Sequence, residues 1–183
     1  MKMLLHICCA PCSVMCVETL RGGGVEMELY WYNPNIHPFT EYRSRRDCAV
    51  QYAKSLGITL ITKDHYGLRD FIASLEKTES GRFDVPGRCA FCYRLRLEQT
   101  ARAAKERGFD AFSTSLLVSP YQNHEVIKTT GYEAAQRYGV DFFYRDWRPF
   151  FREGQRKARA AGCYMQKYCG CIFSEEERFG GVT

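Results

Sequence analysis

Three groups of cysteines are the residues in this sequence best suited to chemistry. Seven of the 10 cysteines fall in three short motifs, CCAPC at residues 8–12, CAFC at residues 89–92 and CGC at residues 169–171. A single cysteine is most often a small buried hydrophobe, but three clusters together indicate thiolates that bind a metal. Seven thiols exceed the four that a structural zinc ion or one cubane iron–sulfur cluster needs. The surplus predicts two adjacent metal centres, or one centre with redox-active thiols beside it.

The first motif follows a predicted buried strand. The preceding residues are mostly apolar, and Pro11 cannot continue a strand because it lacks an amide donor. Along a strand, Cys8 and Cys9 would point to opposite faces, whereas a turn lets both converge on one centre. We therefore expect Cys8, Cys9 and Cys12 at the carboxyl end of the first strand, the edge where open α/β sheets bind ligands.

Alternating strands and helices predict the elements that position the other motifs. Further strands are predicted at 25–32, 58–62, 110–116 and 140–144, and helices at 13–21, 40–56, 68–77, 92–107, 123–138 and 150–161. This order predicts an α/β fold, a single-domain Rossmann-like parallel sheet with helices on both faces. The right-handed crossover rule favours the strand order 3-2-1-4-5. We expect one domain, 1–183, with the metal-binding segment 150–175 packed onto it.

Composition limits the classes of protein. Hydrophobic residues make up 45% and charged residues 26% of the chain, as in ordinary globular proteins. The apolar runs are too short for a membrane span and the N-terminus does not resemble a signal peptide, so we expect a cytoplasmic protein with no membrane partner. In a reducing compartment, clustered cysteines are more often metal ligands than disulfides. The net charge of +5 permits, without requiring, a polyanionic partner.

Five motifs resemble those of the QueH family of epoxyqueuosine reductases. They read LHICCAPC at 5–12, YNPNIHP at 32–38, RCAFCYRLRL at 88–97, SLLVSPYQNH at 115–124 and QKYCGC at 166–171. The resemblance implies a fold related to adenine-nucleotide α-hydrolases, a [4Fe–4S] cluster and an adjacent mononuclear iron. It also implies a cobalamin-independent oxidoreductase of queuosine biosynthesis, which converts epoxyqueuosine in tRNA to queuosine with electrons from an unidentified donor.

The family reaction suggests a division of the seven thiols. Removing the epoxide oxygen as water needs two electrons and two protons. A cluster can supply electrons singly, and a metal with an open position can polarise the oxygen. We assign the cluster to Cys89, Cys92, Cys169 and Cys171, and the second iron to Cys8, Cys9 and Cys12. Some relatives carry Asp at the position of Cys12. Cys16 and Cys48 are expected in the core, and Cys163 is expected not to be a ligand.

Three histidines and a tyrosine are the polar candidates near the metals. His6 either faces the metals or belongs to the core, and His37 follows the second strand at the same sheet edge. His124 opens a predicted helix, where capping is the alternative role. We favour His124 and Tyr121 as catalytic substrate contacts or proton donors.

Two arginine-rich helices are candidates for phosphate contacts. Arg43, Arg45 and Arg46 form one basic group, and Arg152, Arg156, Lys157 and Arg159 form another. Of these we assign RNA binding to Arg43, Arg46, Arg152 and Arg156, although solvated helix faces would look the same. The turn at 147–151 is the candidate for stacking a base, since at least two of the aromatic residues at 30–32 are expected in the core.

Other functions explain part of the sequence. A non-catalytic zinc-binding RNA module would also use a C-x-x-C motif and a basic surface. A sulfur-transferring tRNA enzyme of the related hydrolase fold would need a Ser-Gly-Gly-x-Asp-Ser ATP loop after the first strand, where this chain reads CCAPCS at 8–13, so no ATP is expected. A radical S-adenosylmethionine enzyme would need a C-x-x-x-C-x-x-C motif, which the sequence lacks.

Overall fold

The fold is built on a parallel five-stranded sheet. The computed structural model describes residues 1–75 and 85–181, without the side chains of 85 and 86. The strands are β1 (Lys2–His6), β2 (Glu26–Trp31), β3 (Leu60–Thr62), β4 (Ala111–Thr114) and β5 (Asp141–Phe142). Their order is β3-β2-β1-β4-β5 with every pair parallel, which confirms the predicted fold class and strand order.

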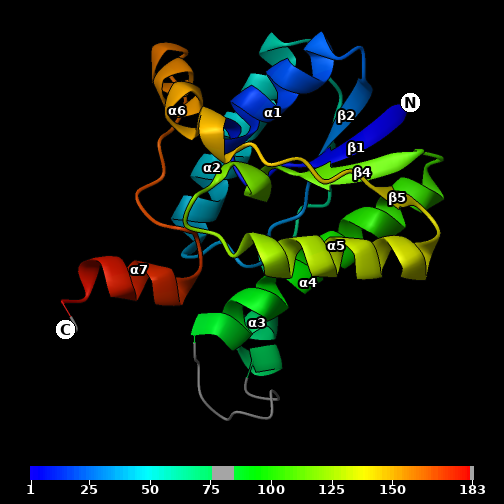
Figure 1. Cartoon of the computed structure of the whole chain (residues 1–183). Helices are drawn as coiled ribbons and strands as arrows, with labels where there is room; N and C mark the ends of the chain where they lie inside the picture. The colour runs from blue at the N-terminus through cyan, green and yellow to red at the C-terminus, as the bar shows by residue number, and fades with distance from the viewer. Residues whose placement is uncertain (76–84, 182–183) are drawn as a thin grey trace.

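Helices cover both faces of this sheet, as Figure 1 shows. One layer contains α1 (Ala10–Gly22), α2 (Phe39–Ser55) and α6 (Phe151–Ala160), and the other contains α4 (Val85–Glu106) and α5 (His124–Tyr138). The shorter helices are α3 (Leu68–Leu75) and α7 (Ile172–Phe179), and 3₁₀ turns occur at η1 (Ser115–Val118) and η2 (Arg148–Phe150). No helix in the described ranges is long and apolar enough to cross a membrane.

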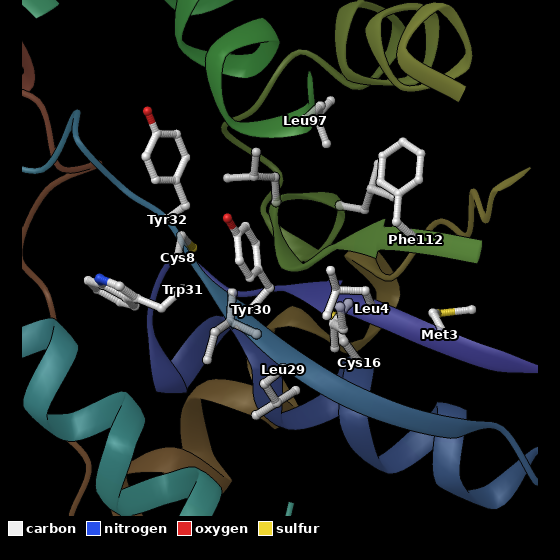
Figure 2. Packing of buried hydrophobic residues seen from close by; sticks show 14 of the residues in the cluster. Met3, Leu4, Cys8, Cys16, Leu29, Tyr30, Trp31, Tyr32, Leu97 and Phe112 are labelled. Atoms are coloured by element: carbon white, nitrogen blue, oxygen red, sulfur yellow. The ribbon is translucent and has the colours of Figure 1, made fainter. Parts of the chain in front are cut away.

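The central strands supply the core because both of their faces are covered. Met3, Leu4 and Leu5 of β1 are fully buried. Alternation along β2 directs Tyr30 toward α4, where its hydroxyl accepts a hydrogen bond from Gln99 at 3.2 Å. Trp31 points the other way, toward α2, as Figure 2 shows. The whole aromatic run at 30–32 is buried, which confirms the core assignment for this strand.

The sequence-based boundaries are wrong at two places that matter for the site. Residues 85–88 begin α4 rather than forming a loop, since proline is tolerated in a first helical turn whose amides have no helical partner. Cys89 and Cys92 therefore lie on the helix itself. The fourth strand ends at Thr114, whose hydroxyl accepts from Leu116 N at 3.2 Å and starts the η1 turn. The helix α7 was not predicted; Cys171 is its N-cap residue.

Candidate metal centre and substrate cleft

Cys8, Cys9 and Cys12, the thiol triad, meet where β1 passes into α1. Their sulfurs all lie within 4.8 Å of one another and all three residues are buried. Cys9 is the N-cap residue of α1 and Pro11 occupies its first turn, so the chain turns sharply and both adjacent thiols face one point. The Cys8 amide donates to Ser115 Oγ at 3.2 Å, which ties the triad to η1. In the described part of the chain, this is the one group that brings three metal-ligand atoms so close.

The three thiols share negative charge unequally. Hydrogen bonds from Cys12, and then from Cys9, hold the pKa of Cys8 well below its ordinary value. The same interaction with Cys8 raises the pKa of Cys12, and burial raises that of Cys9. The first thiolate therefore forms at Cys8, and a bound cation would favour deprotonation of the other two.

Cys89, Cys92, Cys169 and Cys171, the thiol tetrad, come together from α4 and the C-terminal segment. Cys92 and Cys171 pack in one small apolar cluster with Phe71 and Leu75. The pKa of Cys92 is raised to about 12, first by burial and also by the charges of the other three tetrad thiols. Arg88, one turn before Cys92, pairs with Glu177 of α7 at 2.7 Å and so docks α7 on the start of α4. The structure thus places the CAFC motif on α4 close to the CGC motif of the C-terminal segment.

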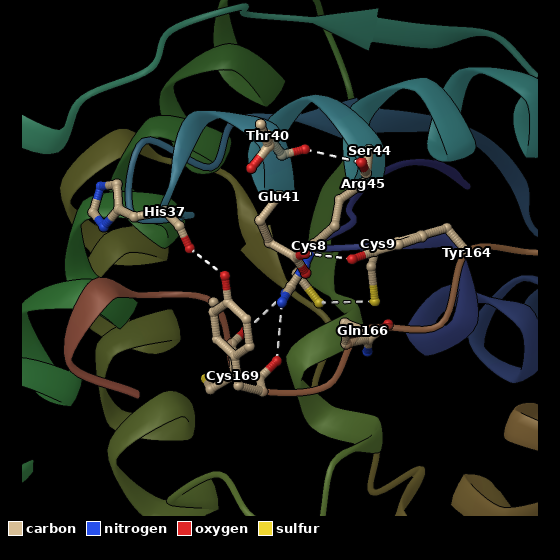
Figure 3. Close-up of polar contacts among 12 residues, drawn as sticks. Cys8, Cys9, His37, Thr40, Glu41, Ser44, Arg45, Tyr164, Gln166 and Cys169 are labelled. Carbon is tan, nitrogen blue, oxygen red and sulfur yellow. Dashed lines mark hydrogen bonds and ion pairs between the residues drawn. The ribbon is translucent and has the colours of Figure 1, made fainter. Parts of the chain in front are cut away.

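Residues 162–171, here called the strap, carry Cys169 and are held by α2 (Figure 3). Arg45 of α2 donates to the backbone oxygens of Tyr168 at 2.9 Å and Cys169 at 2.8 Å. Its Nε also pairs with Glu41 at 2.6 Å, so the buried guanidinium is fully engaged. Gly170 then turns the chain with φ at +144°, a conformation that L side chains rarely adopt. Arg45 therefore orients the strap rather than reaching solvent.

Arg96 lies between the triad and the tetrad. Its side chain is buried, and it donates from Nη2 to Cys92 Sγ and from Nε to Cys92 O, both at 3.1 Å. The charges of Cys92, Cys8 and Cys169 act against burial to raise its pKa. Within the described residues, no carboxylate lies within ion-pair distance of Arg96. Of these three thiols only Cys8 has a lowered pKa, so Cys8 is the thiolate that faces this cation.

A cleft of about 500 Å³ opens beside these groups. Cys8, Cys12 and Cys169 form part of its wall together with Arg96, so it touches the triad and the tetrad at once. Two amides direct N–H groups at its sulfurs: Gln166 Nε2 donates to Cys12 Sγ and Gln122 Nε2 to Cys169 Sγ, each at 3.3 Å. Tyr121, 84% exposed, packs edge-on against Phe151, and both line the cleft.

The donor set fits an iron–sulfur group. Six of the seven cysteines are buried or line the cleft, and Cys89 is half-buried. Amide and guanidinium N–H groups are directed at three of the sulfurs, an arrangement that stabilises thiolate and cluster charge. Purely thiolate ligation also suits zinc. By their chemistry both groups suit a soft metal, and among the described residues only the triad has its sulfurs within 4.8 Å of one another.

Comparison with known proteins identifies the family of this chain. A family model described as epoxyqueuosine reductase QueH matches residues 3–177. The chain belongs to the QueH family. It is 37% identical to the epoxyqueuosine reductase QueH of Dehalococcoides mccartyi over 98% of this chain and 95% of that protein. It is 34% identical to QueH of Thermotoga maritima over 96% of this chain and 91% of that protein.

Solved structures share the fold at low sequence identity. The U34-tRNA thiolase NcsA from Methanococcus maripaludis, solved with its [4Fe–4S] cluster, superposes with a TM-score of 0.61 at 14% identity. The match covers 94% of this chain and 61% of the thiolase. A predicted tRNA methyltransferase subunit from Methanocaldococcus jannaschii gives 0.51 at 14% identity, covering 86% of this chain and 76% of that one. Both comparisons show that this chain shares the fold of these proteins.

The three candidate histidines are all buried, and each has its own hydrogen-bond partners. His6 is fully buried and bonded to Thr114 Oγ1 at 2.9 Å and Asn33 Oδ1 at 3.1 Å, which makes it a core residue. His37 is buried between Pro34 O and the Ile172 amide. His124 is also buried, with Nε2 3.2 Å from Ser119 O, and it does not line the cleft. The helix cap beside it is Asn123, not His124.

The basic candidates separate into free and paired groups. Arg43, Arg152 and Arg156 are exposed, and no ion pair involves them in the described part of the molecule. Arg46 pairs with Asp47 and Asp64 at 2.9 and 2.7 Å. The interpretation of Arg45 as part of a phosphate-binding group is wrong, because that side chain is buried in the strap contact. The stacking role for the turn at 147–151 fails at Trp147, which is fully buried with Nε1 bonded to Thr19.

Sequence reasoning missed several side chains at the site. Arg96, Gln122 and Gln166 all stand inside the motifs that resemble QueH, four residues or fewer from a metal-site cysteine or Tyr121, but residue type alone did not single them out. Lys167 and Arg178 also line the cleft and were not considered. Spacing could have flagged Arg96, which falls one helical turn after Cys92.

The remaining cysteines have two kinds of environment. Cys16 is fully buried, as expected of a core residue. Cys48 is half-buried on α2, so its assignment to the core is wrong. The helix directs this position toward the strap, where Cys48 Sγ accepts a hydrogen bond from Tyr164 N at 3.2 Å. Cys163, half-buried too, lies beside Cys48 and away from the metal centre.

Proposed function

We propose that this chain is an iron–sulfur epoxyqueuosine reductase, which converts epoxyqueuosine at the wobble position of tRNA to queuosine. The observation that carries the proposal is the close set of Cys8, Cys9 and Cys12 beside a cleft that Cys169 and the buried Arg96 also line. Membership of the QueH family supports the same reaction. We further propose that the enzyme is cobalamin-independent and cytoplasmic, and uses no ATP, since the loop after β1 carries thiols where an ATP loop would lie.

The reaction sets what the site must provide. The epoxide gains two electrons and two protons, both C–O bonds break, an alkene forms and the oxygen leaves as water. Bound at the site, a [4Fe–4S] cluster would supply electrons singly and an adjacent iron would act as a Lewis acid. We propose that Cys89, Cys92, Cys169 and Cys171 hold the cluster, and that Cys8, Cys9 and Cys12 hold the second iron.

The chain's own polar groups would hold charge in place during this reaction. Arg96 contacts Cys92 directly and faces the charges of Cys8 and Cys169, so it can offset negative charge that arrives with each electron. Gln122 and Gln166 donate to cysteine sulfurs that line the cleft, which fixes their amide planes. The Gln122 carbonyl oxygen accepts from the Tyr93 hydroxyl at 2.8 Å, whereas Gln166 Oε1 has no hydrogen-bond partner among the described residues and so can accept from a ligand.

The cleft mouth suits a base that is turned out of an RNA loop. Tyr121 presents an exposed ring braced by Phe151, a surface on which a base can stack. We propose that Tyr121 contacts the nucleoside or donates a proton to it. His124 bonds to Ser119 O and so supports the turn that carries Tyr121.

Phosphate contacts would come from basic residues around this mouth. We propose Arg152 and Arg156 on α6 and Arg43 and Arg46 on α2 as RNA-binding residues. Phe151 and Gln155, from the same helix as Arg152 and Arg156, line the cleft, which supports the α6 contacts most directly. Lys167 and Arg178 join this set because they line the cleft themselves.

Metal analysis separates this enzyme from a zinc-binding RNA module. Protein purified without oxygen should be brown, with iron and acid-labile sulfide in near-stoichiometric amounts and little zinc. A colourless protein with zinc and no sulfide would favour the non-catalytic module and refute the proposed reductase.

A further inference from the structure

Cys48 and Cys163 form a pair of thiols outside the triad and the tetrad. Cys48 lies on α2, and Cys163 follows α6 at the start of the strap. The Tyr164 amide donates to Cys48 Sγ at 3.2 Å, and that amide is joined directly to the carbonyl carbon of Cys163. By backbone bond lengths, Cys48 Sγ lies at most about 6 Å from Cys163 Cα. The two side chains are thus placed to meet.

The thiols also interact with each other. Burial, and then the charge and hydrogen bonding of the Cys48 thiol, raise the pKa of Cys163 to about 11. Both residues are half-buried, so a small oxidant can reach them, whereas Cys16, the other cysteine outside the metal centre, is fully buried. Neither thiol faces the triad or lines the cleft.

A bond between these residues would add a covalent link to the polar contacts that already join α2 to the strap. Arg45 holds the far end of the strap, and the Tyr164 hydroxyl donates to Glu41 at the near end. All three α2 residues, at positions 41, 45 and 48, lie three or four apart and so share a helix face. Cys48 extends this contact toward α6.

We propose that Cys48 and Cys163 form a reversible disulfide that fastens the strap to α2 when the cell meets peroxide. Hydrogen peroxide is the oxidant: the two thiols lose two electrons and two protons, the O–O bond breaks, the S–S bond forms and two waters leave. A dithiol reductant reverses the step. The bond keeps the strap, and with it Cys169, in place while oxidants attack the metal centre.

Peptide mapping tests bond formation. After peroxide treatment of the full chain, alkylation of free thiols and denaturing tryptic digestion, peptides 47–54 and 160–167 each contain one cysteine. They should appear cross-linked, lighter by two hydrogen atoms than their sum, and separate after reduction. The cross-link should vanish in Cys48→Ser and Cys163→Ser and persist in Cys16→Ser. Recovery of both peptides alkylated or over-oxidised, or of Cys163 joined to peptide 168–178, would overturn the proposal.

Limited proteolysis tests the tether. Lys167 is exposed within the strap, so native protein offers trypsin a site there. After equal peroxide treatment, cleavage at Lys167 should be several-fold slower in the wild type than in Cys48→Ser, and dithiothreitol should abolish the difference. Because both proteins suffer the same damage at the metal centre, equal cleavage rates would refute the tether. Neither readout depends on epoxyqueuosine reduction.

Discussion

Arg96 Nη2 lies 3.1 Å from Cys92 Sγ, one helical turn earlier on α4, and this contact places a cation between the triad and the tetrad. A buried guanidinium needs a negative partner, and in the described part of the chain that partner is not a carboxylate. Cys92, Cys8 and Cys169, from three motifs, are the thiols whose charged forms raise the Arg96 pKa, and Cys8 is the one whose own pKa is lowered. The site is thus electrostatically matched to a group that carries negative charge.

Replacing this cation should make the bound cluster harder to reduce. In Arg96→Met, the extra negative charge of the reduced cluster would no longer be stabilised by a hydrogen bond from a charged group, which is worth about 1.5–3 kcal/mol. The reduction potential should therefore become more negative. A dye-mediated titration of anaerobic protein measures this. Arg94→Met, at an exposed position on the same helix, is the matched control. An unchanged potential in a fully loaded Arg96→Met protein would contradict the assigned role.

Gly170 should tolerate no side chain. Its φ is +144°, and an added Cβ would lie 3.1 Å from Arg45 Nη1 and 3.3 Å from Ile36 Cγ1. Gly170→Ala should therefore shift the strap, lower stability by about 1–3 kcal/mol and reduce iron content. Gly162→Ala is the control: its φ is +69° with nothing within 4 Å, so it carries only the backbone cost. Thermal unfolding and iron analysis of both variants check this, and equal iron content in the two would argue against the account of the strap.

Cys12 tests the division of the thiols. It stands in the first turn of α1, and its sulfur accepts from Gln166. Cys12→Ala should keep cluster absorbance but lose the additional iron and most turnover, whereas Cys12→Asp should keep some activity because a carboxylate can bind iron. Loss of the cluster with retention of one iron would show that the triad holds the cluster instead.

The sequence predicted the fold and the approach of the cysteines better than the side chains between them. The parallel sheet could be predicted because strands and helices alternate along the chain. The position of three thiols at the end of β1 could be predicted because Pro11 cannot continue a strand. The burial of Arg45 and the 3.1 Å contact of Arg96 depend on how α2 and α4 face the strap, a tertiary relationship that helical periodicity does not contain. Trp147 was misassigned for the same reason, since a turn that contains a proline looks exposed until α1 packs against it through Thr19.

Buried histidines should make stability depend on pH. His37 Nε2 donates to Pro34 O and Nδ1 accepts from Ile172 N, an arrangement that suits the neutral ring, and burial lowers its pKa to about 4. The unfolded chain binds a proton near pH 6.5 and the folded one does not, so stability is full above pH 6.5 and falls as pH drops toward 4. Denaturant unfolding across this range should show a shallower fall in His37→Gln than in wild type. His65→Gln, at a half-exposed position, should match the wild type, and an equally steep fall in His37→Gln would exclude this origin.

RNA binding should weaken as salt rises. Phosphate contacts release counterions, so the logarithm of affinity should fall linearly with the logarithm of salt concentration. Arg152→Gln and Arg156→Gln should each flatten that slope by about one contact. Arg137→Gln is the control, because Arg137 pairs with Glu98 in the helix layer of α4 and α5, on the face of the sheet opposite to α6. Anisotropy titrations of an anticodon stem-loop measure the slope, and unchanged slopes in both α6 variants would remove α6 from the interface.

Reduction of epoxyqueuosine in RNA tests the central claim most directly. Protein purified without oxygen, with iron and sulfide quantified, is mixed with a chemical reductant and an anticodon stem-loop that carries epoxyqueuosine, and the digested nucleosides are analysed by mass spectrometry. The account predicts a product lighter by one oxygen atom, formed over many turnovers by the wild type and lost in Cys89→Ser. An iron-loaded wild type that binds the RNA and leaves the epoxide intact would contradict it.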